Sequence, residues 1–265
     1  MSASALFAAG DLAGCLAQLQ DEVRRQPADG KLRIFLAQLA MVVGNWERAL
    51  NQLAVAAELD AGALPMLHAY RAAIQCERLR TEVFQGTRSP LVFGEPLPWI
   101  AWLLQALNLQ AAGRADQAAA LRTEALQAAQ PVVGTLNGAS FEWVADADSR
   151  LGPVLEVLLN GAYYWVPFER IQQVVIEPPA DARDLVWVPA QFTWTNGGES
   201  MGLIPVRYPG SELSADDTIR LARRTEWVSL GGEQYAGLGQ RMLTSDTDEV
   251  GLLETRELTL RTAAA

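Results

Sequence analysis

Histidine and lysine, which often serve as general bases, metal ligands or phosphate-binding cations, are almost absent from this chain. Its 265 residues include one histidine, His68, and one lysine, Lys31. A Ser-His-Asp triad, a multi-histidine metal site or a Gly-Lys-Ser/Thr phosphate loop would each need one of these residues, and neither has the required neighbours. The sequence therefore argues against most hydrolases, zinc enzymes and phosphate-loop enzymes.

A carboxylate cluster is the strongest remaining candidate for chemistry. Asp146 and Asp148 follow an apolar segment, as the acidic loop follows a strand in aspartate-dependent phosphotransferases. That chemistry also needs a lysine downstream, and the chain's lysine lies upstream. Glu142 and Glu156 are close enough in sequence to add oxygen ligands for a divalent cation. The competing interpretation, which we favour, is an ion pair between Arg150 and one of the two aspartates.

The other reactive residue types have structural explanations. His68 lies in a helical segment without an Asp or Cys ligand nearby. Cys15 and Cys76 form no Cys-X-X-Cys pair, so we expect reduced thiols in a reducing compartment. Glycines over residues 231–239 suggest a phosphate loop, but no Lys-Ser/Thr follows. We therefore predict no catalytic residue, no metal and no cofactor.

The elements that must position these residues fall into two parts. Residues 1–131 are rich in Ala, Leu and Gln and carry 11 basic and 12 acidic side chains. Residues 132–265 carry 10 basic and 19 acidic side chains, with paired prolines, β-branched residues and five of the eight tryptophans. The second composition is typical of sheets and turns. We therefore predict an α+β protein of two domains, 1–131 all-helical and 132–265 mostly antiparallel β with one or two short helices.

A repeated motif organises the first part. A glycine is followed five positions later by a small residue, in the pairs Gly10 and Cys15, Gly44 and Ala49, and Gly113 and Ala118. The first two copies are 34 residues apart, which is the period of tetratricopeptide (TPR) repeats. The glycine lets the chain reverse between antiparallel helices, and the small residue lets those helices approach closely. We expect six or seven helices in TPR-like pairs, interrupted by a loop over residues 86–98.

The second part has the alternating pattern of antiparallel strands. Its clearest hairpin joins residues 186–194 to residues 201–208 through an Asn-Gly-Gly turn at 196–198. Residues 153–160 begin with a proline and are predicted as a short helix. Residues 214–224 fit either a helix or the entry to a strand. Further strands are expected over residues 141–145, 163–166, 171–176, 226–230, 240–244 and 250–258.

A binding surface is the function that stacked helix pairs favour. The first helices of such pairs form a concave face that commonly holds a peptide or a partner helix. The repeat register predicts an apolar groove with few charges, suited to an amphipathic helix. The groove residues are Lys31, Ile34, Gln38, Met41, Ile100, Leu103, Leu107 and Gln110.

Charge and hydropathy limit the partners and the cellular location that we expect for the protein. The net charge of −10 and the isoelectric point near 4.7 argue against nucleic acid or anionic lipid as a partner. The start of the chain lacks the basic region of a signal peptide, and no apolar run reaches the roughly 18 residues of a membrane span. We therefore expect a cytoplasmic protein without a membrane segment.

A series of short motifs in the second part resembles the ImpE family, also called TagJ, of accessory proteins from bacterial type VI secretion clusters. The motifs are FEWVADADSRLGP at 141–153, GAYYWVP at 161–167, RDLVW at 183–187, PVRYPGS at 205–211, RTEW at 224–227 and GQR at 239–241. The resemblance extends over nearly the whole chain. It marks as structural or interaction residues Glu142, Trp143, Asp146, Asp148, Arg150, Arg224, Glu226, Trp227 and Arg241.

The resemblance implies a non-enzymatic cytoplasmic accessory factor of the contractile sheath. Some family members bind the N-terminal helix of the small sheath subunit, and the family is thought to influence sheath assembly or recycling by the unfoldase of the system. Two alternatives stay open on the residues alone. One is a metal-dependent enzyme or regulator centred on Asp146 and Asp148, and the other is a general cytoplasmic repeat scaffold.

Overall fold

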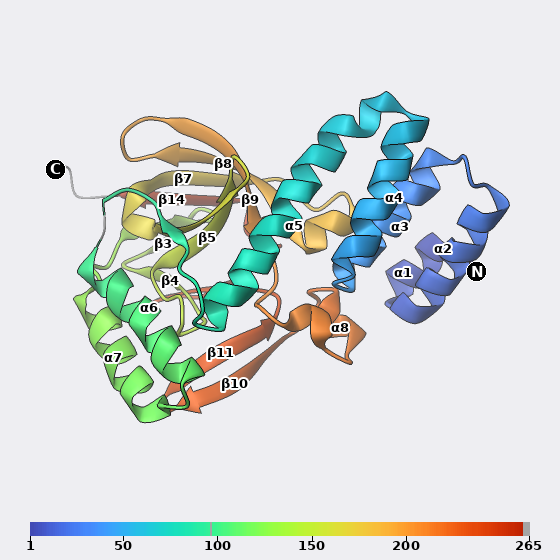
Figure 1. Cartoon of the computed structure of the whole chain (residues 1–265). Helices are drawn as coiled ribbons and strands as arrows, with labels where there is room; N and C mark the ends of the chain where they lie inside the picture. Colours follow the sequence, from blue (N-terminus) through green and yellow to red (C-terminus); the bar gives the residue numbers. More distant parts are fainter. Residues whose placement is uncertain (96, 262–265) are drawn as a thin grey trace.

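Helices make up the first part of the chain in the computed structural model, which describes residues 1–95 and 97–261 (Figure 1). Seven α-helices precede residue 131 in the described range, which confirms the expected number. They are α1 (Ala3–Ala9), α2 (Leu12–Arg25), α3 (Gly30–Val42), α4 (Trp46–Leu59), α5 (Leu64–Phe84), α6 (Pro98–Ala111) and α7 (Ala115–Ala128), with a short 3-10 turn at Ala61–Ala63.

The repeated motif forms the predicted helix hairpins. Gly10, Gly44 and Gly113 lie between α1 and α2, α3 and α4, and α6 and α7, with φ values of 85°, 71° and 73°. Glycine adopts this left-handed conformation without the Cβ clash that other residues meet. The small residues Cys15, Ala49 and Ala118 are completely buried where the helices approach.

The third hairpin does not stack on the first two. Helix α5 is 21 residues long and runs from the α3–α4 hairpin towards α6 and α7, which lie near strands of the second part (Figure 1). The chain between the second and third copies therefore forms one long helix and a loop instead of a helix pair. Because that pair is missing, the helices do not form one continuous TPR-like array.

The second part is built on antiparallel strands. Within the described residues, 1–95 and 97–261, nine strands form one sheet. Their order is β1-β6-β5-β9-β8-β7-β14-β2-β3, and only β1 and β6 are parallel neighbours. A second sheet has the order β13-β12-β4, and β10 pairs with β11 alone. The bounds are β1 (Leu91–Val92), β2 (Val133–Leu136), β3 (Ala139–Phe141), β4 (Val144–Asp146), β5 (Val154–Leu159), β6 (Ala162–Pro167), β7 (Ile171–Ile176), β8 (Trp187–Trp194), β9 (Glu199–Pro205), β10 (Thr225–Gly231), β11 (Gln234–Gly239), β12 (Met242–Ser245), β13 (Glu249–Gly251) and β14 (Glu257–Arg261).

Most strand predictions agree with these bounds. The 186–208 hairpin is formed by β8 and β9, with Gly197 at φ 79° in its turn. The predicted strand 250–258 is strand only at its two ends, in β13 and β14, with residues 252–256 outside both. The predicted strand 141–145 is interrupted at 142–143, between β3 and β4. The ambiguous segment 214–224 contains a single helical turn, α8 (Asp217–Arg220), before β10 begins.

The predicted helix over residues 153–160 is wrong, because this segment is strand β5. All six of its residues are buried, since β5 lies between β6 and β9 and is covered on both faces. Val154 and Leu158 belong to one hydrophobic core, whereas Leu155 and Val157 belong to another. Successive side chains of a strand point to opposite faces, so a strand covered on both sides reads as a continuous apolar run.

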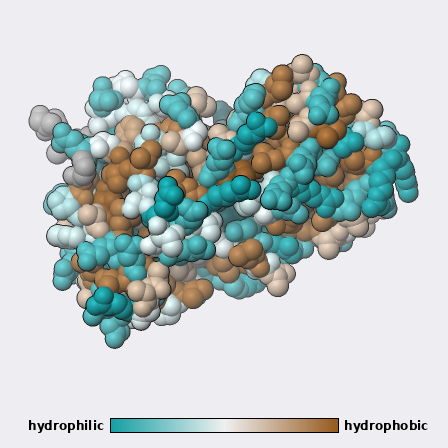
Figure 2. Space-filling model, viewed as in Figure 1, coloured by the Kyte–Doolittle hydropathy of each residue, from teal (hydrophilic) through white to brown (hydrophobic). Residues whose placement is uncertain are grey.

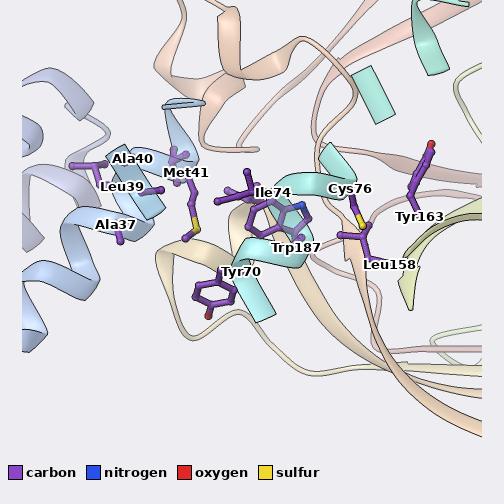
Figure 3. Close-up of a cluster of buried hydrophobic side chains, with 14 of the residues drawn as sticks. Ala37, Leu39, Ala40, Met41, Tyr70, Ile74, Cys76, Leu158, Tyr163 and Trp187 are labelled. Atoms are coloured by element: carbon purple, nitrogen blue, oxygen red, sulfur yellow. The ribbon is translucent and has the colours of Figure 1, made fainter. Parts of the chain in front are cut away.

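The first core joins the helices to the sheet. Met41 and Ile74 from the helices lie in the same cluster as Leu158 and Trp187 from the strands (Figure 3). The Trp187 ring stacks on that of Trp46, with centroids 5.8 Å apart and an interplanar angle of 28°. The last helix of the first part ends at residue 128, and the next strand begins at residue 133. The first core contains residues from both sides of the predicted domain boundary between 131 and 132.

Hydrophilic and hydrophobic residues are intermixed on the face of the molecule drawn in Figure 2. Figure 2 shows hydrophobic residues at the end of the helical part where α4 ends and α5 begins, and Leu59 and Leu64 there are 45% and 42% exposed. No helix of the described chain combines the length and the apolar composition needed to cross a membrane.

Candidate functional site

A buried network of charged side chains lies where α5 meets the large sheet. Its centre is Glu156 of β5, whose side chain is fully buried. The Arg80 guanidinium of α5 donates to Oε1 and Oε2 of Glu156 at 2.7 and 2.8 Å. Arg241 donates to Oε2 at 3.1 Å, and the Tyr163 hydroxyl donates to Oε1. The carboxylate therefore receives hydrogen bonds from both the helical part and the sheet.

Asp146 forms the second half of this network. Arg241 donates to its Oδ2 through Nε at 2.9 Å and Nη2 at 2.6 Å. The Tyr208 hydroxyl and the backbone N–H of Asp148 each donate to Oδ1 at 2.9 Å. Arg241 thus bridges Asp146 and Glu156, and Arg80 pairs with both Glu156 and Glu77.

The predicted ion pair with Arg150 is confirmed for Asp148. Arg150 donates through Nε to Oδ1 at 2.9 Å and through Nη2 to Oδ2 at 2.5 Å, a bidentate arrangement. The backbone N–H of Gly237 also donates to Asp148, at 2.9 Å. The network joins a turn after β4 to strand β11 and fixes the local course of the chain.

The four carboxylates considered for a cation do not form one site. Glu142 is exposed, and its backbone N–H donates to Asp246, away from the buried network. The Arg241 guanidinium lies between Asp146 and Glu156 and pairs with both, in the place that a bound cation would need. In the described residues no group of three or more His, Cys, Asp or Glu side chains is arranged to hold a metal ion. This arrangement is that of a structural charge network.

Burial and charge act in opposite directions on Glu156. Burial raises its pKa, but the positive charges of Arg80 and Arg241 and their hydrogen bonds outweigh that effect and hold the pKa at about 2. The pKa of the Tyr163 hydroxyl is raised far above its usual range, because burial and the neighbouring Glu156 charge both disfavour the phenolate. Glu156 is therefore ionised and Tyr163 protonated across the physiological pH range.

Several members of the network could not be selected from the sequence. Arg80 occupies a core position of α5, four residues after Cys76 and three before Val83. A charged residue at a core position is the one sequence signal that points to a buried ion pair there. Tyr163 and Tyr208 lie in two of the quoted motifs, but nothing in their spacing points to Glu156 or Asp146. His68, in contrast, is exposed on α5, as its sequence context indicated.

The predicted helical groove is interrupted. Met41, Ile100, Leu103 and Leu107 are at most 3% exposed and belong to the first core, so they do not face a partner. Their apolar pattern reflects burial inside the protein, in a core that the helices share with strands of the sheet. Gln110 is half-buried on α6, in a different hairpin from the α3 positions.

The remaining groove residues lie together at a surface pocket of about 390 Å³. It is bounded by α1, α3 and the segment before β8. The rings of Phe7 and Phe35 meet edge to face there, with centroids 5.9 Å apart. The pocket is lined by Ser4, Phe7, Lys31, Ile34, Phe35, Gln38, Ala180, Asp181 and Ala182.

The other motif residues lie at the surface of the second part. Arg224 pairs with Glu226 at the start of β10, and both side chains are about half exposed. Trp227 is 40% exposed and its ring lies 5.7 Å from that of Tyr208. Trp143 is 39% exposed at a second pocket, between α7 and β4.

These features define a two-part α+β protein in which TPR-like helix hairpins are joined to an antiparallel sheet by a shared core and a buried charge network. The crystal structure of protein VPA1032 from Vibrio parahaemolyticus has the same fold, with a TM-score of 0.89, 25% identity and coverage of 98% of each chain. The family model described as "ImpE protein" matches residues 138–259. The type VI secretion system accessory component TagJ of Pseudomonas aeruginosa is 49% identical over 258 residues, covering 97% of this chain and 90% of that relative.

The chain belongs to the ImpE family, which confirms the resemblance found in the sequence motifs.

Proposed function

We propose that this protein is a non-enzymatic accessory factor of a type VI secretion system and acts in the cytoplasm by binding other proteins. The observation that supports this most strongly is the 49% identity to an accessory component of that system along 97% of the chain. The full engagement of Asp146 and Glu156 by arginines supports a structural role for the residues that an enzyme would have used.

The binding surface of this proposal is the pocket between α1 and α3. Phe7, Ile34 and Phe35 provide apolar contacts, while Lys31 and Asp181 lie at the same pocket. An amphipathic helix could bury its apolar stripe against these side chains and keep its polar face in solvent. The proposed occupant is the N-terminal helix of the small sheath subunit, and its binding would influence sheath assembly or recycling.

Isothermal titration calorimetry with the small sheath subunit, with and without its first helix, tests this proposal. Binding is expected only when the helix is present. Ile34→Asp should weaken it at least tenfold, because a carboxylate would then oppose the apolar stripe. Leu59→Asp is the matched control, since Leu59 is an exposed apolar residue away from the pocket, and it should leave binding unchanged.

The outcomes separate the alternatives. Unchanged binding to the subunit without its first helix contradicts the helix-binding model. A lack of binding to the whole subunit favours a general scaffold. Titration with Mg²⁺, Ca²⁺ and Mn²⁺ addresses the metal-dependent alternative, because saturable heat that disappears in Asp146→Asn would support it.

A further inference from the structure

A second surface pocket, of about 320 Å³, lies in the acidic half of the molecule. It is enclosed by the end of α7, strand β4 and the turn before β5. We propose that this pocket binds a segment of another protein in which one large apolar side chain is flanked by Lys or Arg. This site is separate from the pocket of α1 and α3 and does not depend on the proposed sheath helix.

The wall of the pocket is mainly apolar. Leu126 and Ala129 come from α7, and Val144 comes from β4. The Asp146 carboxylate is fully buried and paired with Arg241. The complete lining is Leu126, Ala129, Gln130, Pro131, Trp143, Val144, Ala145, Asp146, Ala147, Ser149, Gly152, Pro153 and Thr244, none of which is a lysine or arginine.

Trp143 supplies the aromatic contact. Its side chain is 39% exposed, whereas Trp165 and Trp187 are completely buried in the core. A half-exposed tryptophan beside an apolar pocket is the kind of residue that dominates binding energy at protein interfaces. It would cover one side of an apolar side chain inserted between α7 and β4.

Carboxylates lie beside the same tryptophan, on the preceding residue and on the β12–β13 turn. Asp246 Oδ1 accepts from the backbone N–H of Glu142 at 2.8 Å and from that of Trp143 at 3.4 Å, which holds the β12–β13 turn beside the pocket. Glu142, Asp246 and Asp248 are all exposed. Because the lining contains no cationic residue, this rim favours basic groups on the ligand and disfavours acidic ones.

Fluorescence anisotropy with labelled 12-residue peptides tests the proposal. Four peptides carry Phe, Leu, Ile or Trp at the centre with three Lys or Arg on each side. One control peptide has Ala at the centre, and another replaces every basic residue by Glu. At least one apolar-centred basic peptide should bind at least tenfold more tightly than either control.

Protein variants locate the binding. Trp143→Ala should weaken it at least tenfold, and Glu142→Lys with Asp248→Lys should weaken it while reducing its dependence on salt. Asp246 is left unchanged because it holds the turn. Trp227→Ala and Glu199→Lys are matched controls, an exposed tryptophan and an exposed carboxylate elsewhere in the same part, and they should have no effect. Circular dichroism melts verify that each variant is folded.

Three results would overturn the proposal. They are no binding by any of the four peptides at 1 mM, equal binding of the Glu-substituted peptide, and undiminished binding to a folded Trp143→Ala variant. None of these results bears on the sheath-helix titration, which uses a different surface.

Discussion

Arg80 of α5 and Glu156 of β5 form a bidentate ion pair across 76 residues of sequence, with the two side chains 4% and 0% exposed. Arg80 also donates to the carbonyl of Arg207 at 2.8 Å, in the segment after β9. A bidentate guanidinium–carboxylate pair is directional, unlike apolar contact. It therefore fixes the angle at which α5, and with it the helical part, sits on the sheet.

Removing the carboxylate should destabilise the protein strongly. Glu156→Gln leaves Arg80 and Arg241 buried without their shared counter-charge, and the free energy of unfolding should fall by about 3–5 kcal/mol. Denaturant unfolding followed by circular dichroism measures this. Asp21→Asn is the control, because its pair with Arg24 is on the surface, with side chains 51% and 73% exposed. Equal effects of the two substitutions would contradict a structural role for the buried pair.

The same pair predicts a pH dependence of stability. The pKa of Glu156 is held at about 2 in the folded protein against an ordinary value of 4.5. Its contribution is therefore fully present above about pH 5 and declines as the pH falls from 4.5 towards 2, because the unfolded chain takes up the proton first. The stability difference between wild type and Glu156→Gln, measured from pH 7 to pH 3, should be constant at first and then shrink. A difference that grows on acidification would exclude this sign.

Substitution of two hairpin glycines should separate the cost of backbone strain from the cost of a steric clash. Gly44 and Gly113 have nearly equal φ values of 71° and 73°, but a Cβ on Gly44 would lie 2.7 Å from Glu212 Cγ, whereas one on Gly113 meets nothing within 4 Å. Gly113→Ala should cost about 1–2 kcal/mol for the left-handed conformation alone. Gly44→Ala should cost more.

A double variant shows where that excess comes from. Glu212→Ala removes the Cγ atom and should recover part of the loss in Gly44→Ala, but none in Gly113→Ala. Thermal or denaturant unfolding of the wild type, the three single variants and the two double variants with Glu212→Ala provides the comparison. Equal losses for the two glycine variants would mean that the α3–α4 turn does not pack on Glu212 in solution.

The two thiols should be unreactive in the folded protein. Burial raises the pKa of Cys15 and of Cys76 to about 11, and nearby carboxylates add to the effect. A thiol reagent at pH 8 should modify neither residue until denaturant is added, since the thiolate is the nucleophile. Rapid labelling of one thiol in the native state would show that its helix opens locally. Cys15→Ser and Cys76→Ser identify the residue that reacts.

The sequence alone determined the local structure of much of this protein. The glycine and small-residue motifs specify helix hairpins because each turn needs a left-handed residue and each helix contact needs a small one. The alternation over residues 186–208 and its Asn-Gly-Gly turn specify β8 and β9 in the same way. The motif series also identifies the family, and the sequence predicts a pair between Arg150 and either Asp146 or Asp148, which the structure resolves as Asp148.

The tertiary structure decided what those elements face. The apolar residues of α3 and α6 could line an open groove or a core, and a helical period is the same in both cases. Met41 and Leu103 are buried in a core that the helices share with strands of the sheet, whereas the α1–α3 end has a surface pocket. The sequence of segment 153–160 predicts a helix because a strand covered on both faces is continuously apolar. That cover comes from the two cores on opposite faces of the sheet.

The charge network depends most on tertiary structure. Glu142 and Asp146 are close in sequence, so the sequence groups them in one candidate site. Nothing in the sequence connects Arg80 with Glu156 or Arg241 with Asp146. In the folded chain these distant residues are enclosed together, where low polarity makes an unpaired charge costly and directional pairing necessary. The residue types make a buried charge cluster possible. Only the contact between α5 and the sheet makes this cluster connect the two parts of the protein.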